Sequence, residues 1–477
     1  MSVTRQVAVG TAAGRAAVNG WRLVVDALRG QDVDPVRGPV GRAVVMLAIP
    51  MVLEMLMESV FSIVDIFFVA KLGADAVAAV GLTESLMAIV YTVAGGLGIG
   101  VTAVVARRTG EGDRDGAARA TVQALGLGVL LSIVLGVAGV LFAERCLGIM
   151  GASPEALRVG TGYAAVMLGG NGAVVLLFLL NAAFRGAGDA AIAMRVLWLA
   201  NALNILLDPL LIFGPGPFPE LGVTGAAVAT VIGRGVGVLF QLLVLFNGSG
   251  RLHVRVRHLG LDPALVWRLV RLSGAGTLQA FISTVSWIGL TRVMAIFGSQ
   301  ALAGFTVAMR IVMFALLPAW GLGGAAATMV GQGLGAGDPD RAERSVWIAG
   351  LLNLVLLGGA AIIFLAGAPA IVDMFGTEGA AREYAVRCLR IVSCGFFLFA
   401  FGSVLTQSFN GAGDTWTPTW LNLLCYWCWE LPLGWFLARR VGLGPDGVFV
   451  AVTISFSTLT LIAAALFRRG RWRHVVV

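Results

Sequence analysis

GEGDRDGAAR at residues 110–119 recurs as GAGDPDRAER at residues 335–344, and FRGAGD at 184–189 recurs as FNGAGD at 409–414. Both pairs lie 225 positions apart. Gly73, Ala76 and Ala78 are repeated, more weakly, at the same offset as Gly298, Ala301 and Ala303. Because one register holds over more than a hundred residues, the repeats indicate a duplicated bundle. Such repeats are typical of secondary transporters, which bind their substrates between the two halves.

The composition predicts an all-α integral membrane protein. Hydrophobic residues make up 58% of the 477 positions, charged residues make up 13%, and the mean hydropathy is +0.89. About 20 apolar residues cross the hydrocarbon core as a helix. We predict twelve transmembrane helices, at 43–69, 77–106, 120–143, 161–183, 190–213, 222–247, 272–297, 300–330, 346–368, 389–409, 415–438 and 446–467. The stretches 77–106 and 300–330 are long, so we expect tilt or kinks near Gly95, Gly96 and Pro318.

The halves are expected to form two pseudo-symmetric six-helix lobes with parallel topology around a central cavity. The N-lobe covers 43–247 and the C-lobe covers 272–467, with a basic linker at 248–271 and tails at 1–42 and 468–477. The repeated glycine-rich segments fall in turns, where glycine permits the turn and aspartate caps the next helix. The N-terminal tail, with Arg15, Arg22 and Arg29 apart from Trp21 and Leu28, is either an amphipathic surface helix or a disordered extension.

The net charge of +8 does not indicate a nucleic-acid partner, because most basic residues fall in the tails and in alternate loops. Basic loops stay in the cytoplasm during insertion, so we expect an inner-membrane protein with both termini cytoplasmic. Attraction of the basic loops to anionic membrane lipids follows. Three scattered histidines and the Cys425-Tyr-Trp-Cys428 segment assemble no zinc or redox site, and we expect no cofactor.

The first span carries three acidic residues on one helix face. Glu54, Glu58 and Asp65 are spaced so that they lie within about 40° of one another. Each would cost about 3 kcal/mol facing lipid, so they are expected to face an aqueous or protein interior. Pro50, one turn earlier, removes a backbone hydrogen bond and makes this helix a candidate for bending.

The fifth span supplies a second polar face, with Asn201, Asn204 and Asp208 followed by Pro209. Carboxylates from spans one and five could together bind a proton or Na⁺. Ser283 and Leu290 occupy the repeat positions of Glu58 and Asp65, so coupling is expected in the N-lobe.

Three further residues join the predicted polar interior. Glu430 is the main acid of the C-terminal spans, and Asn181 either lines the cavity or hydrogen-bonds at a helix end. Glu84 lies one position from the repeat equivalent of Arg310, and we expect the two to form an ion pair.

With LAIP and IVD in helix one, NAAFRGAGD after helix four and NILLDPLLIFG in helix five, the chain resembles the multidrug and toxic compound extrusion (MATE) family over residues 43–467. The resemblance implies cation-coupled export of amphipathic, often cationic organic compounds. It implies a cation site at Asp65, Asn204 and Asp208, with Thr230 and Tyr163 nearby.

The chain also departs from the family pattern. The tyrosine usual one turn before the helix-one aspartate is Phe61, which removes a hydroxyl ligand for Na⁺. The acids that another branch carries in helices seven and ten are absent, so H⁺ is favoured over Na⁺. The extra acids suggest that the cavity, lined by Glu54, Glu58, Phe61, Asn181, Asn201 and Glu430, is unusually acidic.

The sequence therefore predicts a monomeric antiporter for small organic compounds, working by alternating access, and not an enzyme. A lipid-precursor flippase is one alternative, although it would need a basic cavity. An ion channel or a proton-conducting subunit of a membrane enzyme is another, although neither a filter motif nor cofactor ligands are present.

Overall fold

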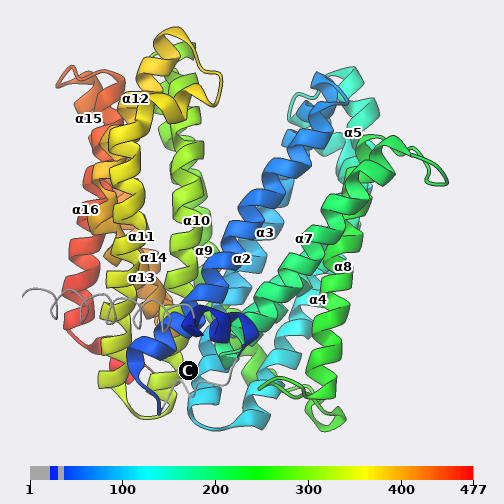
Figure 1. Ribbon diagram of the computed structural model, residues 1–477, viewed down its shortest axis with the longest axis vertical. Coiled ribbons are helices and arrows are strands. Elements are labelled where there is room, and N and C mark those ends of the chain that lie inside the picture. Colours follow the sequence, from blue (N-terminus) through cyan, green and yellow to red (C-terminus); the bar gives the residue numbers. More distant parts are fainter. Residues whose placement is uncertain (1–21, 31–36, 476–477) are drawn as a thin grey trace, which may run out of the picture.

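The computed structural model describes residues 22–30 and 37–475, and these form a helical bundle in two lobes (Figure 1). The predicted tail positions Arg15 and Trp21 lie outside the described residues. The N-lobe consists of α2 (Val40–Ala70), α3 (Ala74–Gly110), α4 (Arg114–Ile149), α5 (Pro154–Gly169), α6 (Asn171–Ala187), α7 (Ala190–Phe213) and α8 (Val223–Asn247).

The C-lobe follows a connection that contains the short 3-10 helix η1 (Val256–His258). Because its first helix begins at Pro263, where Asp262 caps it, the connection is shorter than the predicted linker. The C-lobe consists of α9 (Pro263–Ala295), α10 (Ser299–Gly335), α11 (Pro339–Asp373), α12 (Gly379–Cys394), α13 (Phe396–Ala412), α14 (Trp416–Asn422), the π-helix η2 (Leu423–Glu430), α15 (Leu431–Arg439) and α16 (Pro445–Arg468), and the 3-10 helix η3 (Arg471–His474) ends the described chain.

Each of the twelve predicted spans corresponds to one helix or to one run of adjoining helices. Within the described ranges, nine helices are long and apolar enough to cross a membrane, counting α5 and α6 as one. A tenth is the pair α12 and α13, which meet at 60°. The more polar α9 and the run α14, η2 and α15 complete the set of twelve.

Two of the spans are broken at glycines that the sequence analysis did not single out. Both α3 and α10 continue as single helices of 37 residues through Gly95, Gly96 and Pro318. Breaks occur instead at Gly170, between α5 and α6, and at Gly395, between α12 and α13. These two glycines are again 225 positions apart, so the halves share this break as well as the sequence motifs.

The repeated turns have the predicted geometry. Gly112 and Gly337 adopt φ of 77° and 74°, a region that glycine enters without steric cost. The following aspartates cap the next helices, because Asp113 accepts from the backbone N–H of Gly116 and Asp338 accepts from that of Arg341, both at 2.8 Å. Positive φ recurs at the same offset in the pairs Gly73 and Gly298, Gly151 and Gly376, and Gly188 and Gly413.

The lobes meet at the end of the bundle that holds the C-terminus, and their helices spread apart toward the other end (Figure 1). Glycines allow the close contact. A Cβ on Gly110 would lie 2.1 Å from the Gln332 carbonyl oxygen, and one on Gly335 would lie 2.2 Å from that of Arg107. At another point on α3, a Cβ on Gly96 would lie 2.1 Å from the Thr277 hydroxyl of α9. The contact between α3 and the C-lobe therefore excludes larger side chains.

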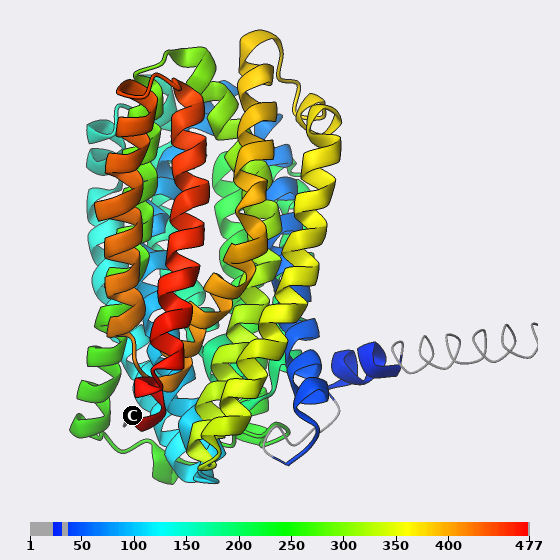
Figure 2. The ribbon, with the colours of Figure 1, turned by 90° about the vertical axis from the view of Figure 1, so that its left-hand side faces the viewer.

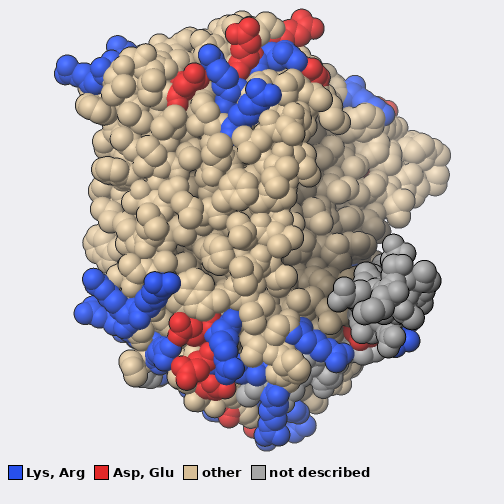
Figure 3. Space-filling view, turned by 60° about the vertical axis from the view of Figure 1, so that its left-hand side comes forward, with Lys and Arg blue, Asp and Glu red and all other residues tan. Residues whose placement is uncertain are grey.

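Charged side chains gather at the two ends of the molecule. In the view of Figure 3, a broad band without Lys, Arg, Asp or Glu separates them, as a membrane-spanning surface requires. Residues 22–29 form a short helix that projects sideways from the base of the bundle (Figure 2). It is held there by Arg195 of α7, which donates to the Leu28 carbonyl oxygen at 2.7 Å, and by an ion pair between Arg42 and Asp26.

Candidate transport site

Asp208 lies in the interior of the N-lobe without a hydrogen-bond partner. The residue has 0% of its surface exposed, and neither carboxylate oxygen is hydrogen-bonded. One turn earlier on α7, the Asn204 amide donates to the Thr230 hydroxyl of α8 at 3.0 Å, while its own carbonyl oxygen has no partner. The predicted residues of helices five and six are thus neighbours, and the side-chain oxygens of Asn204 and Asp208 have no hydrogen-bond partner.

Asp65 reaches the same region from α2. Its carboxylate is close enough to that of Asp208 for the two charges to repel each other. The buried Tyr163 of α5 is near both carboxylates. The structure therefore brings together Asp65, Tyr163, Asn204, Asp208 and Thr230 from four helices.

The two other acids of α2 are held in ion pairs. Arg185 of α6 donates to Glu54 at 3.3 Å, and Arg234 of α8 donates to Glu58 at 3.2 Å. The Glu54 side chain is only 2% exposed, whereas that of Glu58 is 28% exposed. Because a buried carboxylate needs a partner, these arginines allow α2 to carry its acids inside the lobe.

Amide side chains complete the network around the two ion pairs. Asn181 donates to Glu54 at 3.1 Å and accepts from Gln241 at 2.6 Å. Asn201 donates to the second oxygen of Glu58 at 3.3 Å. Asn181 and Asn201 are buried in these contacts, which connect α2 to α6, α7 and α8. The sequence predicted the acids and the asparagines, but it did not predict that Arg185 and Arg234 are their partners.

Arg234 lies between two aromatic rings. Its guanidinium is 5.7 Å from the centre of the Phe61 ring and 5.8 Å from that of Tyr91. Phe61, where the family has a tyrosine, therefore packs against a buried cation. Glu84 is an exposed residue of α3 and forms no ion pair with Arg234 among the described residues. The expected ion pair of Glu84 with Arg310, across the two lobes, is not formed among the described residues, where both side chains are exposed.

Pro50 lies inside α2, which continues as one helix through this position. Its ring is buried where α2 packs against the C-lobe helix α10, near the contact between Met51 and Gly321. The missing N–H of Pro50 leaves one backbone carbonyl of α2 without its usual partner. The helix is thus weakened next to the ion-paired Glu54.

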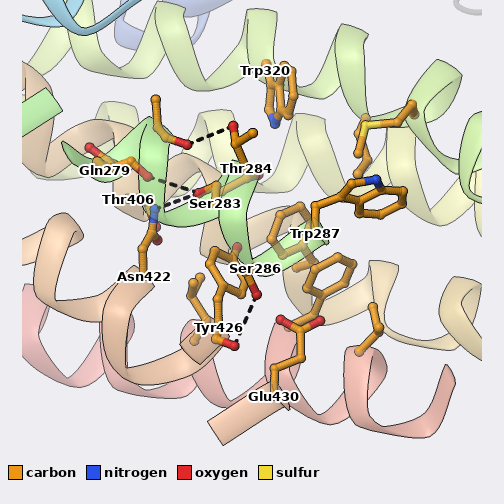
Figure 4. A pocket seen from close by; sticks show the side chains of 18 of the residues that line it. Gln279, Ser283, Thr284, Ser286, Trp287, Trp320, Thr406, Asn422, Tyr426 and Glu430 are labelled. Atoms are coloured by element: carbon orange, nitrogen blue, oxygen red, sulfur yellow. Dashed lines mark hydrogen bonds between the residues drawn. The ribbon is translucent and has the colours of Figure 1, made fainter. Parts of the chain in front are cut away.

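Glu430 lies apart from the N-lobe acids. It forms part of the wall of a cavity of about 420 Å³ within the C-lobe, together with polar and aromatic residues of α9, α10, α13 and η2 (Figure 4). Apart from Glu430 itself, no residue pattern in the sequence predicted this cavity. In neither lobe do the described residues contain a group of three or more His, Cys, Asp or Glu side chains arranged for a metal ion.

A helical bundle of two similar lobes, with a buried polar site in a membrane-spanning region, defines a multi-pass membrane transporter. The MatE family model matches residues 50–210 and 277–436, one match in each lobe. The chain therefore belongs to the MatE family of transporters, and it is not an enzyme.

Two proteins with similar sequences have different names. The probable multidrug resistance protein YoeA of Bacillus subtilis is 27% identical over 428 residues, which cover 89% of this chain and 92% of the relative. A protein named FAD transporter from Shewanella oneidensis is 28% identical, with 75% of this chain and 79% of the relative covered.

A solved structure agrees with the fold. It is described as the outward-facing conformation of a multidrug resistance MATE family transporter of the MOP superfamily. Its TM-score with this chain is 0.86 at 26% sequence identity, and the match covers 93% of this chain and 98% of that structure. The fold predicted from the sequence, twelve helices in two six-helix bundles, is confirmed.

Proposed function

We propose that the protein is a proton-coupled antiporter that exports amphipathic organic cations from the cell. The observation that supports the proposal most directly is the state of Asp208, which is buried beside Asp65 with both oxygens unpartnered. A charged carboxylate in such a place costs several kcal/mol, whereas a carboxylate that has bound a cation costs much less. The pair can therefore bind a coupling ion and release it when the surroundings change.

H⁺ suits this site better than Na⁺. A hard metal cation needs several oxygen ligands at once. Phe61 contributes no hydroxyl group, and the Thr230 oxygen already accepts a hydrogen bond from Asn204. One proton, by contrast, needs only one carboxylate oxygen. Na⁺ bound by Asp65, Asn204 and Asp208 remains the alternative that the experiment below tests.

The lobes have the arrangement that alternating access requires. They are in close contact at the end that holds the C-terminus and spread apart at the other (Figure 1). We place both termini in the cytoplasm, because basic residues are concentrated in the tails and in the loops on that side. The end at which the lobes spread apart then faces the outside of the cell. Proton binding at Asp65 and Asp208 would favour bending of α2 at Pro50 and closure around the N-lobe interior.

The charge of the N-lobe interior is unfavourable for an anionic substrate. The acids outnumber the arginines there, because Glu54, Glu58, Asp65 and Asp208 share the interior with only Arg185 and Arg234 among the described residues. This excess disfavours an anion such as FAD or the pyrophosphate of a lipid precursor. We further propose that the transporter is a monomer in the inner (cytoplasmic) membrane.

The test uses purified protein in proteoliposomes loaded with ethidium, under an imposed pH gradient or an imposed Na⁺ gradient. The wild type is expected to move ethidium with the pH gradient, and Asp208→Asn and Asp65→Asn should lose that response because neither amide binds the proton. Glu144→Gln, an exposed acid of α4, is the matched control and should behave as the wild type.

Other outcomes favour the alternatives. A response only to the Na⁺ gradient would replace H⁺ by Na⁺ as the coupling ion. Scrambling of labelled lipid without ethidium movement would favour the flippase, and passive ion current without any substrate would favour a channel.

A further inference from the structure

The C-lobe contains a cavity that the coupling scheme does not use. It measures about 420 Å³, within the range of ligand pockets, and lies between α9, α10, α13, η2 and α16. Figure 4 shows the Glu430 carboxylate pointing into it, near Ser286 and Trp287. We propose that this cavity is a binding site for a monovalent organic cation with an aromatic or apolar body, and that Glu430 binds the positive charge.

Glu430 differs from the glutamates of α2 in having no arginine. The residue is 3% exposed, and its carboxylate lies near Ser455 of α16. No ion pair involving Glu430 occurs among residues 22–30 and 37–475. Glu54 and Glu58, by contrast, are each paired with an arginine from a neighbouring helix. A buried carboxylate that the protein does not neutralise can be neutralised by a bound cation.

The π-helix η2 fixes the position of Glu430, its last residue. Its wider turns leave backbone carbonyl groups available to neighbouring side chains. The Cys425 carbonyl oxygen accepts from the Ser455 hydroxyl at 3.0 Å, and that of Tyr426 accepts from the Ser286 hydroxyl at 3.2 Å. The distorted segment is therefore tied to α16 on one side and to α9 on the other.

The N-lobe has no counterpart of this arrangement. The residues at the repeat positions of η2 lie within α7, which is a regular α-helix, and Ile205 occupies the position of Glu430. The distortion and the acid thus occur together in one lobe only. π-Helical segments are frequently found at functional sites, and this one places a carboxylate in a cavity wall.

The remaining walls suit the apolar body of an organic cation. Trp287 is stacked on Phe305 with the ring centres 5.6 Å apart, and Phe399 is stacked on Phe456 at 4.2 Å. Trp287, Phe399 and Phe456 line the cavity together with Met309 and Met313. Aromatic faces attract cations, and methionine side chains adapt to ligands of different shape. The side chain of Gln279 also lines the cavity, and its amide oxygen has no hydrogen-bond partner among the described residues.

One wall of the cavity comes from the other lobe. Ile99 of α3 lines it, and Gly276 of α9 allows the approach, since a Cβ there would lie 3.2 Å from the Ile99 side chain. Relative motion of the lobes would therefore change the cavity. Its use as a substrate site for export rests on the proposed function, but equilibrium binding of a cation does not.

The experiment measures binding of tetraphenylphosphonium to the full-length protein in detergent, by isothermal titration calorimetry without any ion gradient. Triphenylphosphine oxide, a neutral compound with similar rings, is the comparison ligand. The wild type should prefer the cation at least tenfold, and Glu430→Gln should lose that preference because the amide carries no charge. Glu144→Gln is the matched control and should keep the preference.

Ser283→Phe is the second variant, because it fills the cavity while leaving Glu430 in place. It should weaken binding of both ligands, after size-exclusion chromatography has shown that each variant is folded. Unchanged cation preference in Glu430→Gln, or unchanged binding in Ser283→Phe, would overturn the proposal. Normal cation preference in Asp65→Asn, with loss of gradient-driven transport, would support separate sites for substrate and coupling ion. If Asp65→Asn transports normally, the proposed coupling scheme is wrong. The binding measurements on Glu430→Gln and Ser283→Phe would still test whether the cavity binds the cation.

Discussion

Replacing Arg185 by Met should strongly destabilise the N-lobe, because it leaves the Glu54 carboxylate buried with only Asn181 as a donor. The Glu54 side chain is 2% exposed, and its second oxygen already lacks a partner. Removing one member of a buried ion pair typically costs about 3–5 kcal/mol. Arg185 itself is 23% exposed, so part of its charge is solvated before the mutation. We therefore expect the free energy of unfolding to fall by about 3 kcal/mol, the lower end of that range.

A double-mutant cycle separates this effect from the loss of packing. Replacing both Glu54 and Arg185 by Met removes both charges, and the double variant should unfold within about 1 kcal/mol of the wild type. The free energy of unfolding can be measured by titration with sodium dodecyl sulfate, with tryptophan fluorescence as the signal.

The control for the cycle is Arg158→Met. Arg158 pairs with Glu155 at the start of α5, where the side chains are 73% and 53% exposed. This exposed pair, screened by water, should contribute little to stability. If Arg185→Met and Arg158→Met destabilise the protein equally, or if the double variant is less stable than Arg185→Met, the reasoning about buried charge is refuted.

Further predictions concern the lobe contact, the π-helix and the topology. Gly110→Ala places a Cβ 2.1 Å from the Gln332 carbonyl oxygen, so it should separate the lobes at the closed end, which increased distances between spin labels on α3 and α10 would show. Gly112→Ala is the control, because a Cβ on Gly112 would meet no atom within 4 Å. The positive φ of 77° at Gly112 makes alanine strained there, but the interlobe distances should not change. Ser286→Ala removes the hydrogen bond to the Tyr426 carbonyl and should lower the free energy of unfolding by about 1 kcal/mol in the same detergent titration; no change would show that the bond contributes nothing to stability. A fluorescent protein fused after Val477 should fluoresce in the cytoplasm, and a fusion that is exported and dark would reverse the topology.

The sequence predicted the spans well because continuous apolar runs determine which segments enter a membrane. Composition does not determine the hydrogen-bond geometry inside a span. The break at Gly395 and the π-helix ending at Glu430 depend on contacts with neighbouring helices, such as the hydroxyls of Ser286 and Ser455. The helices α3 and α10 are continuous at Gly95 and Pro318, and the tilt or kink expected there stays a prediction.

The candidate site was predictable in part. A charged residue in a membrane span is costly, so Asp65 and Asp208 stand out in the sequence. The residues that contact the buried acids cannot be recognised in the same way, because pairing depends on which helices are neighbours. Arg234 could have been singled out as a cation in an apolar span, but only the structure shows that it pairs with Glu58, whereas Arg310 is exposed.

The most direct test of the coupling proposal measures substrate and proton movement in the same vesicles. Proteoliposomes loaded with a pH-sensitive dye are given ethidium outside at equal pH and equal Na⁺ on both sides. The proposal predicts that ethidium entering the wild-type vesicles drives protons out, so that the lumen becomes alkaline, and that Asp208→Asn abolishes this pH change. Ethidium uptake by the wild type with no change in lumenal pH would contradict it.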